Sequence, residues 1–240
     1  MLPLDISFDF RADSFGGDPD SKSKTLKSFH KMLWSKQLPN GDFFKLEDDV
    51  RGSYLRYRSS TREMPLSSDS ITHSYKNLSK MGSILQEIDP VQIEDFQKLG
   101  YTIGGFILFP SQRVDGKLNI NGARGFHPKI MDRFDLTLEC IRRHYLGEVS
   151  PLQGVLRRYS EFFDIFQSFR GYVDFFLLND LVSFDYSQVI FFTPFSELFS
   201  HSPLPRSEAE YLQYRRSSMD FVSKRNTRIS DWTTGIFEGR

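Results

Sequence analysis

The segment YTIGGFILFPSQRVDGKLNINGARGFHPKIMDRFDLTLECIRRHY, residues 101–145, carries the signals of both strand and helix. Its apolar run FILFP predicts a buried strand, and Asp115-Gly116 predicts a hairpin turn into a second strand that ends at Asn121. After GARGF, Pro128 suits the first turn of a long helix that ends at Gly147. The helix has a buried stripe with helical spacing, formed by Ile130, Phe134, Leu138, Ile141 and Tyr145. A strand pair followed by an amphipathic helix predicts an α+β protein.

The remainder of the chain has the same mixed character. Apolar residues alternate with polar ones from Leu4 to Arg11, which predicts an N-terminal strand with one buried face. Residues 42–47 and 53–60 are short strand candidates. Ser207 and Glu210 predict a capping box for a last helix to about Asn226, with a loose tail from Thr227. We therefore expect one α+β domain over residues 1–240, with a mixed, mainly antiparallel sheet packed with helices and a mostly helical C-terminal half.

Composition excludes several classes of protein. The formal net charge of zero argues against a protein that wraps long stretches of nucleic acid, although a local basic patch is compatible with it. The single cysteine, Cys140, cannot form an intrachain disulfide and predicts a reducing, cytoplasmic compartment. No run approaches 18 uninterrupted apolar residues, so no membrane span is expected. Most of the 24 phenylalanines are expected in the core.

The first candidate site is the segment between the expected hairpin and the long helix. Asn119 and Asn121 share one face of the predicted strand, Arg124 follows in the loop, and His127 precedes the helix. A helix N-terminus attracts anions, and a guanidinium can hold a phosphate through two parallel bonds. These four residues therefore predict an anion site. An equally supported alternative is a polar turn in which Arg124 pairs with an acid of the next helix. GARG lacks the P-loop lysine and the Rossmann glycines.

The second candidate is the polar face of the long helix. Charged residues with spacings of three and four lie on one side of it: Asp132, Asp135, Glu139, Arg142 and Arg143. A solvated face with ion pairs is the favoured interpretation. Arg133 lies on a different flank, so charge covers more of the helix than a solvent-facing stripe needs. The alternative assigns Glu139 and Arg133 to catalysis and Arg142 to anion binding.

The third candidate is acidic. Asp5, Asp9 and Arg11 share one face of the expected first strand, and further acids follow at Asp13, Asp18 and Asp20. Carboxylates about 7 Å apart on a strand can act as acid and base or share a divalent cation, and Arg11 adds an anion contact. The favoured alternative is a solvated edge strand. The histidines have no paired metal-ligand spacing, so no metal site is predicted and no cofactor is assigned.

Two resemblances bear on function. LRYRSS followed by PLSSDSIT resembles ADP-ribosyltransferase sites, although the late glutamate of those enzymes is not identified here. FDFRADSFGGDPDS, TIGGFILFP, NGARGF, DRFDLTLECIRRHYLG and GYVDFFLLNDLV together resemble an uncharacterised bacterial family, a domain of unknown function. This resemblance spans about Asp5 to Asn226. It implies a bacterial, soluble, single-domain protein and supplies no catalytic residue.

The leading hypothesis is an enzyme, or a toxin or defence effector, that acts on a phosphate-bearing ligand, either a nucleotide or a nucleic acid. Asp5 and Asp9 would act as bases and Arg124 would hold the anion. The alternative is a non-catalytic binding or assembly protein whose polar groups form an internal network, and an ADP-ribosyltransferase-like enzyme is a lesser one. Burial separates the first two hypotheses, because a ligand site needs Arg124 and a carboxylate on an open pocket. The sequence leaves the oligomeric state open.

Overall fold

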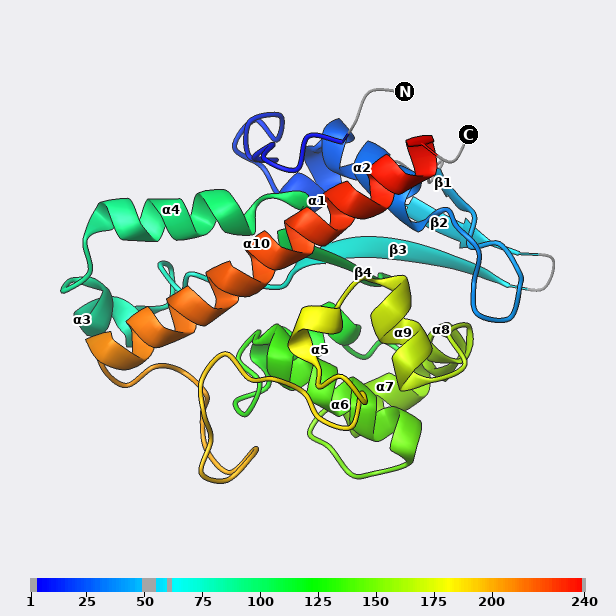
Figure 1. Cartoon of the computed structure of the whole chain (residues 1–240). Helices are drawn as coiled ribbons and strands as arrows, with labels where there is room; N and C mark the ends of the chain where they lie inside the picture. The colour runs from blue at the N-terminus through cyan, green and yellow to red at the C-terminus, as the bar shows by residue number, and fades with distance from the viewer. Residues whose placement is uncertain (1–3, 49–54, 60–61, 239–240) are drawn as a thin grey trace.

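A computed structural model describes residues 4–48, 55–59 and 62–238 of the chain. Within these residues, four strands form one sheet in the order β1-β2-β3-β4, and neighbouring strands are antiparallel (Figure 1). The strands are β1 Leu46–Asp48, β2 Leu55–Arg58, β3 Glu63–Ser70 and β4 Phe106–Pro110. The expected α+β class is confirmed, and two strand candidates correspond to β1 and β2. Residues 53, 54 and 60 of the second candidate lie outside the described residues.

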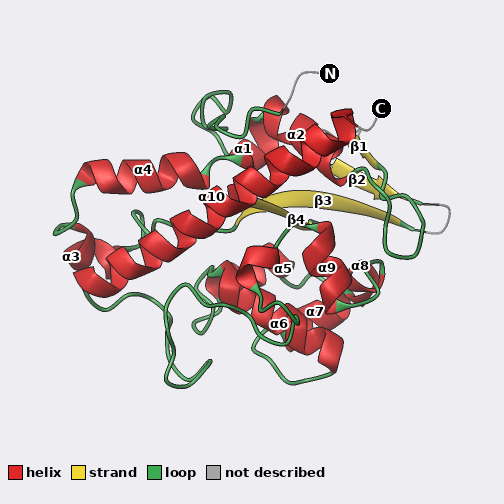
Figure 2. Ribbon diagram, viewed as in Figure 1, coloured by secondary structure: helices red, strands yellow, loops and turns green. Residues whose placement is uncertain are grey.

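Helices lie on both sides of the sheet, as Figure 2 shows. One side carries the N-terminal helices together with α4 and α10, and α5 to α9 lie on the other. The α-helices are α1 Pro19–Lys22, α2 Lys24–Trp34, α3 Gly82–Leu85, α4 Pro90–Gly100, α5 Ile120–Phe126, α6 Phe134–Leu146, α7 Gln153–Arg158, α8 Ser160–Asp164, α9 Phe169–Phe175 and α10 Glu208–Glu238. Three 3-10 helices are η1 Ser79–Met81, η2 Ile103–Gly105 and η3 Asn179–Leu181.

The centre of the core is the junction of β4, η2 and α10. All five residues of β4 are buried, as their uninterrupted apolar character predicts. Gly104 allows α10 to approach, since a Cβ at this position would lie 2.7 Å from the carbonyl oxygen of Val222. Arg225 of α10 is fully buried there and donates to the carbonyl oxygens of Gly104 and Phe106 at 2.8 and 2.7 Å. Backbone carbonyls at this crossing are therefore satisfied by a side chain.

The expected N-terminal strand from Leu4 to Arg11 is wrong, since these residues form turns. The Asp5 carboxylate accepts hydrogen bonds from the backbone N–H and hydroxyl of Ser7, and the Asp9 carboxylate accepts from the N–H of Arg11. Aspartate side chains that bond their own backbone two residues on stabilise turns in competition with strand pairing. The alternating pattern reflects which residues the turns bury, above all Phe10.

The expected hairpin is wrong in its second strand. Asp115 and Gly116 do form a turn, with φ of 53° and 68°. However, Asn119 then caps α5, because its side-chain oxygen accepts from the N–H of Gly122 at 2.9 Å. At an N-cap, the asparagine side chain accepts a hydrogen bond from a backbone N–H group. In a strand, the same N–H group would bond a neighbouring strand instead.

The long helix starts later than expected. Met131 and Asp132 have φ of 47° and 64°, so the chain turns sharply before α6 begins at Phe134. Its end at Gly147, in the left-handed conformation with φ of 72°, is confirmed.

The last helix extends beyond the boundary expected from sequence. Ser207 Oγ accepts from the N–H of Glu210 at 3.2 Å, so the predicted cap is present. α10 then continues through Glu238, and the loose tail expected from Thr227 is wrong. Ile229 is fully buried and the neighbouring Arg228 bonds Asp180 of η3, so this part of α10 stays on the core.

Candidate functional site

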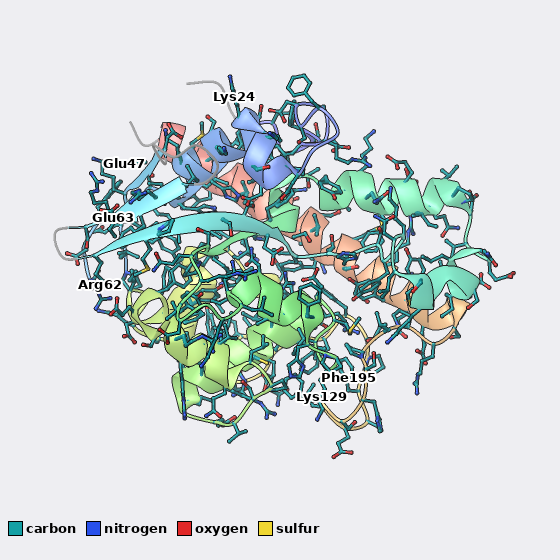
Figure 3. All side chains as sticks on the ribbon, turned by 180° about the vertical axis from the view of Figure 1, so that it is seen from behind. Lys24, Glu47, Arg62, Glu63, Lys129 and Phe195 are labelled. Carbon is teal, nitrogen blue, oxygen red and sulfur yellow. The ribbon has the colours of Figure 1, made fainter. Side chains whose placement is uncertain are left out.

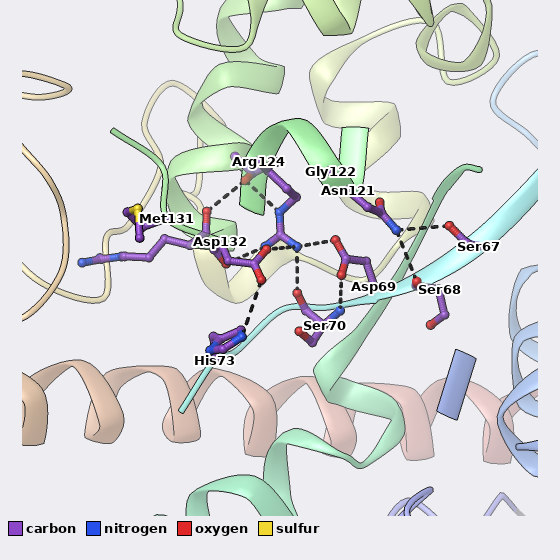
Figure 4. A network of polar contacts seen from close by, with 12 residues as sticks. Ser67, Ser68, Asp69, Ser70, His73, Asn121, Gly122, Arg124, Met131 and Asp132 are labelled. Atoms are coloured by element: carbon purple, nitrogen blue, oxygen red, sulfur yellow. Dashed lines mark hydrogen bonds and ion pairs between the residues drawn. The ribbon is translucent and has the colours of Figure 1, made fainter. Parts of the chain in front are cut away.

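Arg124 of α5 joins β3, α5 and the turn before α6 (Figure 4). Its guanidinium pairs with the carboxylates of Asp69 and Asp132 and donates to the carbonyl oxygens of Ser70 and Asp132, at 3.1 and 2.7 Å. Its Nε donates to Thr137 Oγ1 at 3.2 Å. The side chain is 0% exposed. Arg124 therefore has every nitrogen engaged inside the protein, and the expectation that it lies open to an anion is wrong.

One guanidinium shared by two carboxylates leaves this network one negative charge in excess. Burial raises the pKa of Asp69 to about 6; the Arg124 guanidinium opposes that rise and Asp132 adds to it. His73 Nε2 lies 3.8 Å from Asp132 Oδ2, and burial lowers the pKa of this imidazole. Asp69, whose side chain is 19% exposed, lines a cleft together with Ser70.

The cleft lies between α1, the end of β3 and the start of α5, and has a volume of about 370 Å³. Tyr101 and Phe106 supply apolar lining. The polar lining residues are Asp18, Asp20, Ser67, Ser68, Asp69, Ser70, Ser111, Asn119 and Asn121. Carboxyl, hydroxyl and carboxamide groups thus surround the opening, and no lysine or arginine is among its described lining residues. We call it the β3 cleft.

The two asparagines of the cleft have different roles. Asn119 is occupied as the cap of α5, and its Nδ2 donates to Ser111 O at 2.9 Å. Asn121 donates from Nδ2 to Ser67 Oγ at 3.1 Å and to Ser68 O at 3.4 Å. Since a carbonyl only accepts, these bonds fix the orientation of the amide. Its Oδ1 is then buried without a hydrogen-bond partner among the described residues. Such an atom calls for a donor from a ligand or water.

Asp20 is the second carboxyl group with an unusual environment in the β3 cleft. It caps nothing of its own helix; instead its Oδ1 accepts from the backbone N–H of Ser68 on β3. Burial raises its pKa to about 8; the Ser68 N–H opposes the rise, and the neighbouring charges of Asp18 and Asp69 add to it. Two carboxyl groups in one cleft, with pKa values of about 8 and about 6, can serve as acid and base near neutral pH.

Replacing Asp20 with asparagine should stabilise the protein increasingly as the pH rises from about 4 to about 8. The folded-state pKa is about 8 and lies above the ordinary aspartate value of 3.8, so the unfolded chain loses this proton first and the native state is penalised across that window. Asparagine keeps the acceptor for the Ser68 N–H and removes the charge. We expect a gain on the order of 1–3 kcal/mol at pH 8 and little at pH 4, measured by urea unfolding. An equal difference between variant and wild type at both pH values would refute the shift.

A buried histidine lies behind the cleft and orients one of its serines. Trp34 Nε1 donates to His30 Nδ1 at 2.9 Å, and His30 Nε2 lies 2.8 Å from Ser68 Oγ. Burial, reinforced by the charge of Arg225, lowers the pKa of His30 to about 3, so the ring is neutral. Because the indole N–H can only donate, the ring proton lies on Nε2 and is given to Ser68. His30 therefore cannot take a proton from Ser68, which excludes a serine nucleophile activated by this histidine.

The N-terminal acidic residues predicted as catalytic do not line the β3 cleft. Asp5 is exposed and bonds Ser7. Asp9 holds Arg11 through a bidentate pair, with distances of 3.0 and 2.6 Å, and Arg11 also pairs with Glu94. Arg11 lies over the ring of Tyr101, whose centroid is 5.3 Å from Cζ, and Arg11 is not among the described lining residues of the β3 cleft. Asp5, Asp9 and Arg124 are therefore not brought into one pocket.

The predicted residues on and before α6 also have internal partners. Arg133 is buried and pairs with the buried Asp135, and Glu139 accepts from Arg142 at 2.8 Å and from Arg143 at 2.7 Å. His127 ends α5 and accepts the N–H of Lys129 at 3.2 Å. The catalytic role of Arg133 and Glu139 and the anion-binding role of Arg142 and His127 stay predictions, without a cleft to support them.

Sequence reasoning overlooked the central residues of the β3 cleft. Asp69 lies in the segment SSDS, in which the sequence drew attention only to the serines. Asp20 is one acid in a longer acidic run. A usable signal was present, because Asp69 follows the apolar-flanked segment MPLSS and would be buried if that segment were a strand. Asn121 and Asp13, both named from the sequence, each have a buried side-chain oxygen without a hydrogen-bond partner among the described residues.

Two further observations concern metals and membranes. Among the side chains that the structure describes, no group of three His, Cys, Asp or Glu is placed to hold a metal ion. In the same part of the chain, no helix combines the length and apolar character needed to cross a membrane.

Buried ion pairs and a polar cleft, in an antiparallel sheet covered by helices, define an α+β protein. Residues 4–229 match the model of a family described as "Family of unknown function (DUF6994)", and the chain belongs to that family. The expected family resemblance is thereby confirmed. No curated protein matches the chain, and no solved structure does.

Proposed function

We propose that the β3 cleft binds a small, hydroxyl-rich and uncharged ligand, a sugar or nucleoside moiety, and that Asp20 and Asp69 exchange protons with it. The observation that carries this proposal is the free carboxamide oxygen of Asn121 in a cleft that also holds two carboxyl groups of raised pKa. Hydroxyl groups can donate to both kinds of acceptor, and the apolar faces of Tyr101 and Phe106 suit a ring.

The ligand class differs from the phosphate-bearing one that the sequence suggests. Three carboxyl residues line the β3 cleft, namely Asp18, Asp20 and Asp69, and its described lining includes no lysine or arginine that could pair with a phosphate. If the ligand is a nucleotide, its phosphate must lie outside this cleft. The ADP-ribosyltransferase alternative receives no added support, because no glutamate is among the described residues that line the cleft.

A second candidate function is non-catalytic binding or assembly, which the internal network favours. Arg124, Arg133 and Arg225 are each 0% exposed and are all bonded to protein atoms. These arginines therefore hold secondary-structure elements together. Proton exchange with a ligand would then rest on the carboxyl groups of the cleft.

Thermal unfolding in the presence of matched ligand pairs tests the proposal. We expect neutral sugars or nucleosides to raise the melting temperature, and their phosphorylated counterparts to raise it less. Asn121→Leu and Asp20→Asn should remove at least about tenfold of the affinity, since each loses a buried polar contact of about 1.4 kcal/mol or more. Asn40→Leu, which alters an exposed asparagine bonded to Asp42, is the matched control.

The outcomes separate the candidates. Binding by neutral ligands with turnover that Asp20→Asn and Asp69→Asn abolish supports an enzyme. Binding without turnover supports the non-catalytic candidate. A response to phosphates alone, unchanged in the cleft variants, overturns the proposed ligand class and the proposed cleft together.

A further inference from the structure

Lys36 lies in an aromatic hollow on a different part of the molecule from the β3 cleft. It follows α2, and the hollow of about 500 Å³ beside it is completed by α9 and by the C-terminal end of α10, which runs next to α2 in Figure 1. The Lys36 Nζ lies 5.0 Å from the ring centroid of Trp34, 4.7 Å from that of Phe175 and 4.6 Å from that of Trp232. We call this the Lys36 hollow.

The amine of Lys36 has rings around it in place of the usual carboxylate. Among the residues that the structure describes, no acceptor is paired with Nζ by a hydrogen bond or an ion pair. Asp174 lines the same hollow, but its carboxylate is engaged by Tyr186 Oη and Asn179 Nδ2, at 2.6 and 2.7 Å. Its remaining charge is shared with Arg170, whose Nε lies 3.5 Å from Asp174 Oδ2.

Charge and burial both disfavour the ammonium form of Lys36. Burial lowers the pKa of the amine to about 7; the charge of the buried Arg225 adds to that lowering and Asp174 opposes it. The ring faces attract a cation, but that attraction is modest beside the cost of desolvating an ammonium group. A desolvated lysine beside another cation is the arrangement in which lysine acts as a nucleophile.

We propose that Lys36 forms an imine with a small aromatic carbonyl compound bound in the Lys36 hollow. The lone pair of Nζ attacks the carbonyl carbon, and a proton passes from nitrogen to oxygen to give a carbinolamine. Loss of water then leaves the C=N bond, so amine and carbonyl give imine and water with no other reactant. The rings of Phe175 and Trp232, which line the hollow, offer faces on which an aromatic carbonyl compound stacks, and Asp174 is the carboxylate of the same lining that can carry the proton.

Reductive trapping of the full-length protein with benzaldehyde and cyanoborohydride at pH 7 tests this inference, with peptide mass mapping as the readout. Lys129 is the reference, because it is exposed and labelled at the edge of the molecule in Figure 3. We expect Lys36 to be benzylated at least about tenfold faster than Lys129 at this pH, because a pKa difference of one unit gives a tenfold difference in free amine. The rate at Lys36 should level off above about pH 8, whereas that at Lys129 should keep rising.

Two variants separate a nucleophilic hollow from mere accessibility. Lys36→Met should remove the fast adduct and leave the adduct at Lys129 unchanged. Trp232→Leu opens one wall of the hollow. The benzylation rate at Lys36 should therefore fall towards that at Lys129, although the amine of Lys36 becomes more accessible. Absence of an adduct at Lys36, or labelling that runs parallel to Lys129 across pH, overturns the inference. None of these outcomes depends on the ligand proposed for the β3 cleft.

Discussion

Replacing Arg124 with methionine should lower the free energy of unfolding by about 3–5 kcal/mol, because it leaves a buried ion pair without its cation. The buried carboxyl groups of Asp69 and Asp132 would lose the cation that they share, and the carbonyl oxygens of Ser70 and Asp132 would lose their donor. Urea unfolding at pH 7 measures the loss. The same change at Arg206, whose side chain is 82% exposed in a pair with Glu210, should cost about 1 kcal/mol or less.

Arg124→Lys adds a second, milder test of the same network. Lysine keeps the charge but cannot reach two carboxylates and two carbonyls at once, so we expect an intermediate loss. A stable Arg124→Met protein with lost ligand binding would instead mean that Arg124 serves the ligand. Wild-type stability in both variants would contradict the structural role given to this residue.

How much the sequence could predict is clearest at the segment from Asn119 to Asp135. It correctly indicated that α6 has a buried stripe, and it singled out Asn121 and Arg124, whose ligand-binding roles stay predictions. It could not show that Arg124 turns inward, because its first partner, Asp69, lies 55 residues earlier on β3. Pairing across such a separation leaves no local pattern. The alternative in which Arg124 pairs with an acid of the next helix is partly right. Arg124 pairs with Asp132, which directly precedes α6, but it also pairs with Asp69 of β3.

The N-terminal error has a different physical origin. Alternation of apolar and polar residues from Leu4 to Arg11 fits a strand, but the backbone N–H groups of Ser7 and Arg11 find partners in the side chains of Asp5 and Asp9. Periodicity reports which side chains are buried, and it does not report where backbone donors are satisfied. In the same way, the side chain of Asn119 caps α5, so the predicted second strand of the hairpin does not form. Asparagine or aspartate in or next to an expected strand therefore favours a turn or a helix cap over strand pairing.

Buried arginines explain why charge covered more of α6 than a solvated face requires. Arg133 and Asp135 face inward, and the two carboxylate oxygens of Asp135 accept from the guanidinium while Oδ2 also accepts from the N–H of Phe192 at 2.9 Å. The pair thereby ties α6 to residues 192–203, a stretch with no helix or strand in the described chain. The placement of this irregular segment therefore depends on both members of the fully desolvated ion pair, Arg133 and Asp135.

Arg133→Met should therefore cost about 3–5 kcal/mol of stability, since Asp135 is 0% exposed and would lose the cation with which it is paired. Adding Asp135→Asn to this variant should restore more than about 1 kcal/mol, because the double change removes the stranded charge and keeps an acceptor for the Phe192 N–H. Unfolding of both single variants and the double variant completes the cycle. If the double variant were no more stable than Arg133→Met, the contacts of Arg133 with Thr193 Oγ1 and the rings of Phe195 and Tyr214, rather than its ion pair, would account for the loss.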